Sequence, residues 1–450
     1  MSRQWLGAME KSLDIAIAGA GPAGLATALF LKRAGHNVTI FERFEEPKPV
    51  GSGLILQPTG LSVVADLGLL DDILALGSRI ERLHGADAST GRTVLAVRYD
   101  AQPGGRFGLA VHRAALFNVL FRAAQCQGIA IETGVEIEAL DVGERASLIF
   151  DKSRTVGGRR AGPFDLVVDA SGSRSKLRRC LNDPAEPRQL TYGAFWASLG
   201  WRQGFDENAL LQRYDKASVM IGVLPIGRPE PGAEKMAAFF WSLKPADAEN
   251  VRAAGLDAWK ARLVSLWPQC EAFTSQIDSF DQLSLARYGH HTMKLPAGRR
   301  LAVIGDAAHS TSPQLGQGAN MALLDAAALS HALAQTGNVE AALESYARAR
   351  RWHVRIFQLL SLALTPFYQS DGTMLPFFRD RLVATIAKIP PVPSVLASMV
   401  AGTLIDPFRR IGLEEVHWPD HPAGSGSRET NFSHAGIDAA AADSPAPRHP

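Results

Sequence analysis

Three short apolar runs along the chain have the length and composition of buried β-strands. They occupy residues 13–18, 164–170 and 301–304, and each is followed at once by a turn that contains glycine. A helix start follows each of these turns. We therefore predict parallel strands whose carboxyl ends meet at one edge of a sheet, which is where α/β proteins bind ligands.

A second pattern, in which apolar and polar residues alternate, dominates the middle of the chain. It covers residues 191–201, 217–224 and 236–243, and it also occurs in residues 79–99. Alternation of this kind predicts antiparallel strands with one buried face. The aromatic side chains of this region either line an apolar ligand pocket or simply form core; they include Tyr192, Phe195, Trp196 and Trp201.

The C-terminal part of the chain is predicted to be helical and is unusually apolar. Helical patterns cover residues 325–334, 339–364, 374–389 and 393–405. Two interpretations of the apolar side chains stay open. They pack against the body of the protein or a dimer partner, or they contact a membrane or a lipophilic substrate.

The first strand belongs to a βαβ unit with a glycine fingerprint. Gly19, Gly21 and Gly24 follow the strand in a G-x-G-x-x-G pattern, with Pro22 and Ala23 between the last two, and Glu42 ends the next strand. The first glycine makes the tight turn, the second admits a pyrophosphate, and the third packs helix against strand. An acid at the position of Glu42 accepts from ribose hydroxyls, so the unit predicts a bound dinucleotide.

The last strand leads into a second loop with cofactor-binding character. Asp306 lies at the carboxyl end of this strand, Pro313 stiffens the loop, and Gly316 and Gly318 permit close backbone approach. A helix is predicted from about Gly318, and the positive end of its dipole favours an anionic ligand.

Composition narrows the class of protein. The chain has 450 residues, 46% of them hydrophobic and 20% charged, with a net charge of +2. This balance requires neither nucleic acid nor an anionic membrane as a partner. We expect a protein of the cytoplasm, because the three cysteines fit no metal spacing, and we find neither a secretory segment nor a run of transmembrane length. We also find no catalytic triad, and His290-His291 has no partners at metal spacing.

Two arginines and a glycine pair are further candidates. Arg43 either contacts a phosphate or is an ordinary surface arginine, and Gly51 and Gly53 either approach the cofactor or only turn the chain. Arg113 precedes a helix predicted for residues 114–125, where it is either a surface residue or a cofactor ligand.

Together, these motifs closely resemble those of the single-component (class A) FAD-dependent aromatic monooxygenases, the family of 4-hydroxybenzoate hydroxylase. The resemblance spans residues 12–325. It implies that Glu42 binds the adenosine ribose, Arg113 the diphosphate–ribityl region and Asp306 the ribityl or diphosphate end. The backbone of residues 315–320 would lie along the isoalloxazine. The expected FAD-binding residues are Gly19, Gly21, Pro22, Ala23, Gly24, Glu42, Arg43, Gly53, Arg113, Asp306, Pro313, Gly316, Gly318, Ala319 and Asn320.

One motif departs from the family pattern. The family carries an Asp-Gly pair after the middle strand, which serves both FAD and NADPH, whereas this chain has Ser171-Gly172 with Asp169 two residues earlier. This form is similar to the wider superfamily of flavin halogenases and prenyl reductases, although the tryptophan-rich signature of the halogenases is not found. The departure affects the expected NAD(P)H contact more than the FAD site.

The resemblance implies a reaction as well as a cofactor. NAD(P)H would reduce FAD, O2 would add to form a C4a-hydroperoxyflavin, and oxygen would pass to an aromatic, polyketide-like or lipophilic small molecule. The alternatives are an FAD-dependent reductase or dehydrogenase without oxygen insertion, and a non-catalytic flavin-binding sensor. Only one glycine fingerprint follows a strand, so NAD(P)H is expected to dock transiently. A homodimer is also considered.

The expected fold is α/β, with a Rossmann-like FAD-binding domain, a mostly antiparallel β-sheet substrate domain and a C-terminal helical region. We assign residues 1–75, 100–185 and 286–340 to the FAD-binding domain. Residues 76–99 and 186–285 form the substrate domain, and residues 341–415 the helical region. Residues 416–450 are rich in Gly, Ser, Ala and Pro and are expected to be a disordered tail.

Overall fold

The computed structural model describes residues 12–47, 51–151, 159–182, 186–372, 374–375, 379, 381 and 389–418. Most of the helix predicted for residues 374–389 and nearly all of the predicted tail lie outside these ranges. Within them, none of the helices is both long and apolar enough to cross a bilayer.

The predicted parallel strands form the centre of a six-stranded sheet. Its strand order is β20-β21-β12-β1-β2-β8, in which every neighbouring pair is parallel except β20 and β21. The strands are β1 (Asp14–Ala18), β2 (Asn37–Phe41), β8 (Ala130–Glu132), β12 (Leu166–Asp169), β20 (Ala297–Gly298) and β21 (Leu301–Val303). The carboxyl ends of β1, β12 and β21 therefore meet at one edge, as the apolar runs predict.

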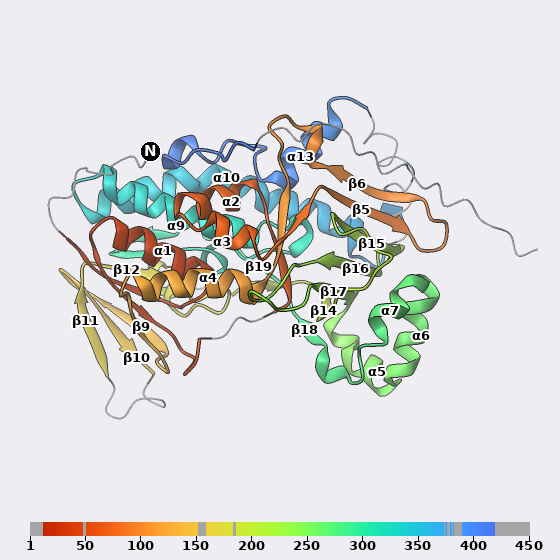
Figure 1. Ribbon diagram of the computed structural model, residues 1–450. Coiled ribbons are helices and arrows are strands. Elements are labelled where there is room, and N and C mark those ends of the chain that lie inside the picture. The colour runs from red at the N-terminus through yellow and green to blue at the C-terminus, as the bar shows by residue number, and fades with distance from the viewer. Residues whose placement is uncertain are drawn as a thin grey trace, which may run out of the picture.

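Alternating side chains bury both faces of this sheet. Ile15 and Ile17 pack against helices, whereas Ala16 and Ala18 pack against a small antiparallel sheet on the other face. The helices are α1 (Pro22–Arg33), α4 (Arg113–Cys126), α9 (Gly318–Gln335) and α10 (Val339–Tyr368), and the small sheet consists of β9 (Ile137–Val142), β10 (Ala146–Phe150) and β11 (Arg160–Phe164). Figure 1 shows this layered arrangement at one end of the molecule.

A seven-stranded sheet forms the other half, in the order β18-β14-β17-β16-β15-β5-β6. Its strands are β5 (Arg82–Asp87), β6 (Thr93–Arg98), β14 (Gly193–Gly200), β15 (Ala209–Asp215), β16 (Val219–Pro225), β17 (Met236–Leu243) and β18 (Ser284–Ala286). Only the pairing of β5 with β15 is parallel among these described strands. The sheet thus draws on the two ranges assigned to the substrate domain, although the division into domains itself stays a prediction.

Helices cover one face of the seven-stranded sheet. They are α5 (Ala248–Ala253), α6 (Leu256–Leu266) and the single turn α7 (Glu271–Thr274), seen at the lower right of Figure 1. The sequence pattern predicts one helix over residues 251–267. The structure divides it at Gly255, whose φ of 94° breaks the helical path.

Shorter elements connect the two halves. A three-stranded sheet, β3-β7-β4, lies beside the helices α2 and α3, and β13 pairs with β19 where the chain passes between the halves. These elements are β3 (Gly53–Leu56), β4 (Ser78–Ile80), β7 (Gly108–His112), β13 (Arg188–Gln189), β19 (Gly289–His290), α2 (Pro58–Asp66) and α3 (Leu70–Leu74). The helices α8 (Asp306–His309) and α13 (Val392–Ala401) complete the described elements that bear on the site.

The apolar C-terminal helices pack on the protein on one side only. Phe357 is buried among Leu315, Met321 and Met399, which joins α10 to the loop after β21. The opposite face of α10 is exposed: Leu359 is 64% exposed and Leu362 is 44% exposed. Packing against the body therefore explains part of the apolar pattern.

A buried charge network fixes α8, α9 and α10 to one another. Asp325 of α9 is fully buried and accepts hydrogen bonds from His309 Nε2 at 2.6 Å and Arg350 Nε at 2.7 Å. Burial opposes ionisation of Asp325, but the charges of His309 and Arg350 prevail and lower its pKa to about 2. Arg350 also lies 3.4 Å from Nδ1 of His353, which donates through Nε2 to Gly402 O at 2.9 Å.

This network makes stability depend on pH. Burial, and then the charge of Arg350, lower the pKa of His353 from 6.5 to about 3. Between these values the unfolded chain binds a proton that the folded chain does not, so the free energy of unfolding should fall as pH drops through this range. The additional loss from Asp325 should appear below its unfolded pKa of 3.8, towards pH 2.

Urea unfolding measured at several pH values checks this expectation, with His353→Gln as the comparison. Glutamine can still donate to Gly402 O but does not titrate. Below pH 6.5, the free energy of unfolding of the variant should therefore depend less steeply on pH, by the equivalent of about one bound proton. Equal slopes in the two proteins would contradict the role given to His353.

Candidate functional site

The three glycines of the first loop meet three different constraints. Gly19 has a φ of 101°, and a Cβ on it would lie 2.7 Å from Ala170 O on the neighbouring strand turn. A Cβ on Gly24 would lie 2.0 Å from Gly19 O, so this glycine lets α1 pack against the loop. A Cβ on Gly21 would meet no described atom within 4 Å, which leaves room for a ligand directly at the start of α1.

The carboxylate of Glu42 is held in place at the end of β2. It is 8% exposed, its Oε2 accepts from the N–H of Ala20 at 2.8 Å, and its Oε1 accepts from the N–H of Phe44 at 3.0 Å. Each carboxylate oxygen can accept further hydrogen bonds, so a ribose hydroxyl can donate to an acid whose position is already fixed.

Two helix N-termini open into the same cavity. Among the described residues, no side chain caps α1, which begins at Pro22, or α9, which begins at Gly318. Both ends line the cavity with small or rigid residues, Pro22 and Ala23 in α1 and Gly318 and Ala319 in α9. Their N–H groups and dipoles favour negative charge, which suits a diphosphate at one end and an anionic ring at the other.

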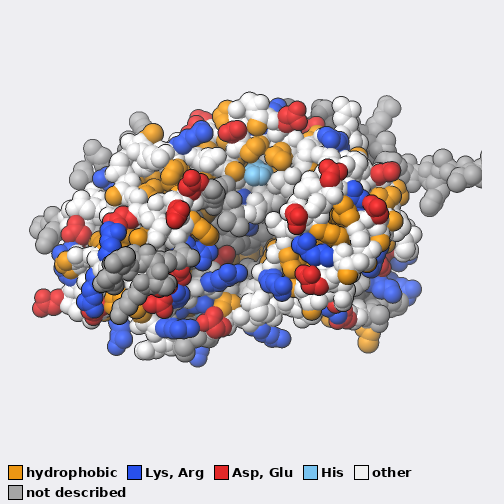
Figure 2. All heavy atoms as spheres, turned by 90° about the horizontal axis from the view of Figure 1, so that it is seen from below, with side chains coloured by type: hydrophobic (Ala, Val, Ile, Leu, Met, Phe, Trp, Pro, Cys, Tyr) orange, Lys and Arg blue, Asp and Glu red, His pale blue; other side chains and the backbone are white. Residues whose placement is uncertain are grey.

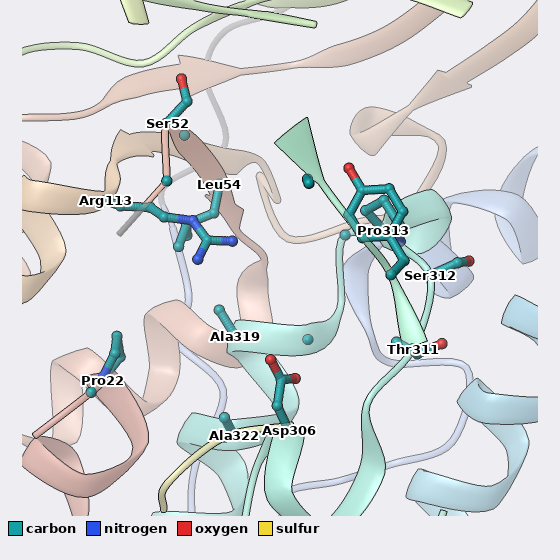
Figure 3. A pocket seen from close by; sticks show the side chains of 18 of the residues that line it. Pro22, Ser52, Leu54, Arg113, Asp306, Thr311, Ser312, Pro313, Ala319 and Ala322 are labelled. Carbon is teal, nitrogen blue, oxygen red and sulfur yellow. The ribbon is translucent and has the colours of Figure 1, made fainter. Parts of the chain in front are cut away.

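Arg113 and Asp306 point into this space from opposite sides (Figure 3). The backbone N–H of Arg113 donates to Ser52 O at 2.9 Å, and its side chain passes over Gly51, where a Cβ would lie 2.9 Å from Arg113 Cδ. Asp306 is exposed to the cavity although the three residues after it are buried. The pair therefore offers a cation and an acceptor to one ligand.

One cavity of about 900 Å³ collects nearly all of the predicted residues. The residues of the expected FAD site that line it are Gly19, Gly21, Pro22, Ala23, Glu42, Arg43, Gly53, Arg113, Asp306, Pro313, Gly316, Gly318 and Ala319. Arg43 also stacks on the ring of Phe44, with Cζ 4.7 Å from its centroid. Figure 2 shows the molecular surface hollowed between the two halves, with Lys and Arg side chains on the rim.

Gly24 and Asn320 are not among the residues that line this cavity, and their expected part in binding FAD stays a prediction. Gly24 lies at the close contact between α1 and the loop at Gly19. The fully buried amide of Asn320 accepts from the N–H of Gln57 at 2.8 Å and donates to Ile55 O at 3.0 Å and Gly316 O at 2.9 Å. Its side chain therefore ties β3 to the loop before α9.

The cavity continues from the cofactor end into an apolar half between the seven-stranded sheet and the C-terminal helices. Alternate residues of the sheet strands face it, among them Trp196, Leu210, Tyr214, Met220 and Phe240. The residues between them, such as Phe195, Ile221 and Phe239, pack against α5–α7 as core. The aromatic side chains therefore divide between the two alternatives that the pattern leaves open.

A hydrogen-bonded aromatic pair lies where the two halves of the cavity meet. Trp196 Nε1 donates to the hydroxyl of Tyr288 at 2.8 Å, and both side chains line the cavity. Burial raises the pKa of Tyr288 to about 12, although Trp196 and the charge of Arg113 oppose the shift. Tyr288 therefore stays protonated at neutral pH.

The motif after β12, which departs from the family pattern, has two parts. Its acid, Asp169, is bonded within the protein, and its Ser-Gly pair faces the cavity. Asp169 is fully buried and accepts from the N–H of Ser171 at 3.0 Å and from the hydroxyls of Ser171 and Ser175. Burial raises the pKa of Asp169 against these hydrogen bonds. Ser171 and Gly172 line the cavity, whereas Asp169 does not.

Together, these features fit FAD. The glycine loop leaves open space at Gly21, Glu42 is fixed for a ribose, and a second helix start and Asp306 lie further along the same cavity. Sequence reasoning missed Gln57, Tyr288 and Gln369, which line the cavity without belonging to a motif. Isolated residues in loops and strand ends carry no periodic signal. Only the alternation around Trp196 pointed to this half, without selecting a residue.

Comparisons with known proteins agree with this fit. Residues 12–357 match a family described as FAD binding domain. The 3-amino-4-hydroxybenzoate 2-monooxygenase of Streptomyces cremeus is 30% identical over 372 residues, covering 76% of this chain and 84% of the relative. The FAD-dependent urate hydroxylase of Mycolicibacterium vanbaalenii is 26% identical over 351 residues, covering 75% and 84%.

The fold also matches solved structures. Klebsiella pneumoniae HpxO, solved with FAD and uric acid, has a TM-score of 0.73 at 20% identity, covering 86% of this chain and 97% of the other. These findings confirm the expected family resemblance and the α/β fold class.

Substitutions of the second and third glycines of the fingerprint, Gly21 and Gly24, should affect cofactor binding and folding separately. Gly24→Ala places a Cβ against Gly19 O and should destabilise the protein by about 1–3 kcal/mol or more, lowering its melting temperature. Gly21→Ala should fold normally but lose most of its flavin, because the new methyl group enters the ligand space. Thermal melts and the flavin-to-protein absorbance ratio measure the two effects. Equal effects of both substitutions on both measurements would contradict this assignment.

Removing the carboxylate of Asp306 should weaken FAD binding roughly tenfold or more, because a hydrogen bond to a charged group is lost. Fluorescence titration of the apoprotein with FAD measures the change. Asp257→Ala, at an exposed position of α6, is the matched control and should bind FAD normally. Unchanged affinity in Asp306→Ala would remove this residue from the site.

Proposed function

The chain belongs to the FAD binding domain family and is an FAD-dependent monooxygenase, and we propose that it uses NAD(P)H and O2 to hydroxylate an aromatic or polyketide-like small molecule. The observation that carries the proposal is the single cavity, which joins a cofactor-binding end to an apolar half lined by aromatic side chains. A ligand in the apolar half would lie beside the end of the loop that begins at Pro313.

FAD, when bound, supplies the exchange of electrons with NAD(P)H and the activation of O2. The chain's own contribution is binding and environment. Glu42 would hold the ribose, the start of α1 the diphosphate, and Arg113 and Asp306 the region between the diphosphate and the ring. The start of α9 would favour negative charge on the ring system by up to about 2 kcal/mol.

The apolar half would exclude water from the reacting atoms. Its walls come from both the sheet and the helices α10 and α13, including Leu224, Phe240, Leu364 and Leu396. Exclusion of water would limit side reactions of the activated oxygen and strengthen electrostatic interactions in the site. The described residues contain no cluster of three or more His, Cys, Asp or Glu side chains that could hold a metal.

Two further parts of the proposal concern the setting of the enzyme. A cytoplasmic location is supported by Cys126, Cys180 and Cys270, which are all free thiols. A homodimer is supported by the exposed apolar side chains of Trp352, Leu359 and Leu362 along one face of α10.

The proposal predicts substrate-stimulated NAD(P)H oxidation that is coupled to O2 uptake. A stopped-flow screen of phenols, quinolones and polyketides with the holoenzyme should find compounds that accelerate flavin reduction. Mass spectrometry should show products that gain one oxygen atom. Reduction of substrate under anaerobic conditions without O2 uptake would identify a reductase or dehydrogenase instead. Bound FAD with no stimulated oxidation in the screen would support a sensor.

A further inference from the structure

The side chain of Gln369 is a buried polar group in the apolar half of the cavity, and among the described residues it has no hydrogen-bond partner. It follows the last residue of α10, lines the cavity and is 5% exposed. Its backbone N–H donates to Thr365 O at 2.8 Å, but neither Nε2 nor Oε1 has a hydrogen-bond partner among the described residues. Each buried amide group left unpaired costs about 1–3 kcal/mol, so a ligand that pairs with both atoms gains correspondingly.

The neighbouring polar side chains on this wall already satisfy one another. The hydroxyl of Tyr214 donates to Gln212 Oε1 at 3.0 Å, and Gln212 Nε2 lies 3.3 Å from the sulfur of Met220. At the junction of the two halves, the indole N–H of Trp196 is likewise taken by Tyr288. Gln369, in contrast, offers both a donor and an acceptor to a ligand.

The charged side chain of the same half of the cavity is already bound by the protein. Arg379 is its one formally charged lining residue among those that the structure describes. It is fully buried, and its Nη1 and Nη2 donate to the carbonyls of Phe367 at 2.7 Å and Lys216 at 3.0 Å. Its guanidinium also lies 5.1 and 5.4 Å from the ring centroids of Tyr214 and Tyr368. These contacts join the helix end to the sheet and already use two of the N–H donors of Arg379, whereas the amide of Gln369 is neutral.

We infer that the substrate is an uncharged aromatic compound with an adjacent hydrogen-bond donor and acceptor, as in a lactam, and that Gln369 recognises this edge. The inference rests on the proposed function, because it takes the apolar half as the substrate site. The primary amide of glutamine pairs with a lactam through two parallel hydrogen bonds, N–H to C=O in each direction. A site that leaves a buried amide unpaired discriminates against analogues that lack the matching groups.

Binding of three bicyclic probes to the FAD-loaded enzyme tests this inference. They are 2-quinolone, which has the lactam edge, quinoline, which lacks it, and quinoline-2-carboxylate, which is anionic. Changes in the flavin absorbance give each dissociation constant. We expect 2-quinolone to bind at least about tenfold more tightly than either of the others. If quinoline binds the wild-type enzyme as tightly as 2-quinolone, or if the carboxylate binds more tightly, the inference is overturned without any variant.

Gln369→Leu should then remove the preference for 2-quinolone while leaving quinoline binding within about twofold. Its melting temperature should not fall, because the substitution removes an unpaired buried amide. Gln127→Leu, at an exposed position after α4, is the matched control and should keep the wild-type ranking. A retained lactam preference in Gln369→Leu would overturn the role of this residue.

The outcome is separable from that of the proposed function. If the enzyme consumes O2 with acidic or purely apolar aromatics and Gln369→Leu does not change the ranking, the proposed function stands and this inference fails. If the holoenzyme neither binds any probe nor consumes O2 with any compound of the screen, the proposed function fails.

Discussion

The cofactor end of the cavity depends on the hydrogen bonds and ion pairs that the buried carboxylate of Asp325 makes. This carboxylate joins three helices, and it also accepts from the N–H of Gly305 at 2.9 Å. Gly305 directly precedes Asp306, so the acid proposed to bind FAD takes its position from a charge network that never reaches the ligand. Loss of one partner would leave an uncompensated charge in the interior, which is far more costly than loss of a surface ion pair.

The same network reaches the C-terminal region. His353 connects Arg350 to the carbonyl of Gly402, directly after α13. Because α13 and the end of α10 also form walls of the apolar half, the position of those walls is linked to the loop that carries Asp306. Ser312 strengthens this link, since its hydroxyl lies 2.9 Å from that of Ser361 in α10. The cavity is therefore framed by segments that are distant in sequence but fixed to one another.

The sequence predicts a cofactor end because the requirements of such a site are local. A turn that only glycine can make, an acid at a strand end and a helix start all leave short, spaced signals, as Gly19, Glu42 and Gly318 do. The apolar half has no such signal. Gln369 becomes significant only because tertiary packing buries it with no hydrogen-bond partner among the described residues. Asn320 belongs to a recognisable motif, yet its side chain bonds to the protein backbone. The break at Gly255 was missed because apolar periodicity continues across it.

The strands of the seven-stranded sheet perform two tasks on alternating residues. On β17, Phe239 and Trp241 belong to the core beneath α5–α7, whereas Phe240 between them faces the cavity. A gene that diverges at every second codon of these strands can therefore reshape the chamber for a new compound without eroding the scaffold. Mutant libraries confined to those codons should sample new chemistry while retaining most of the parent's resistance to heat.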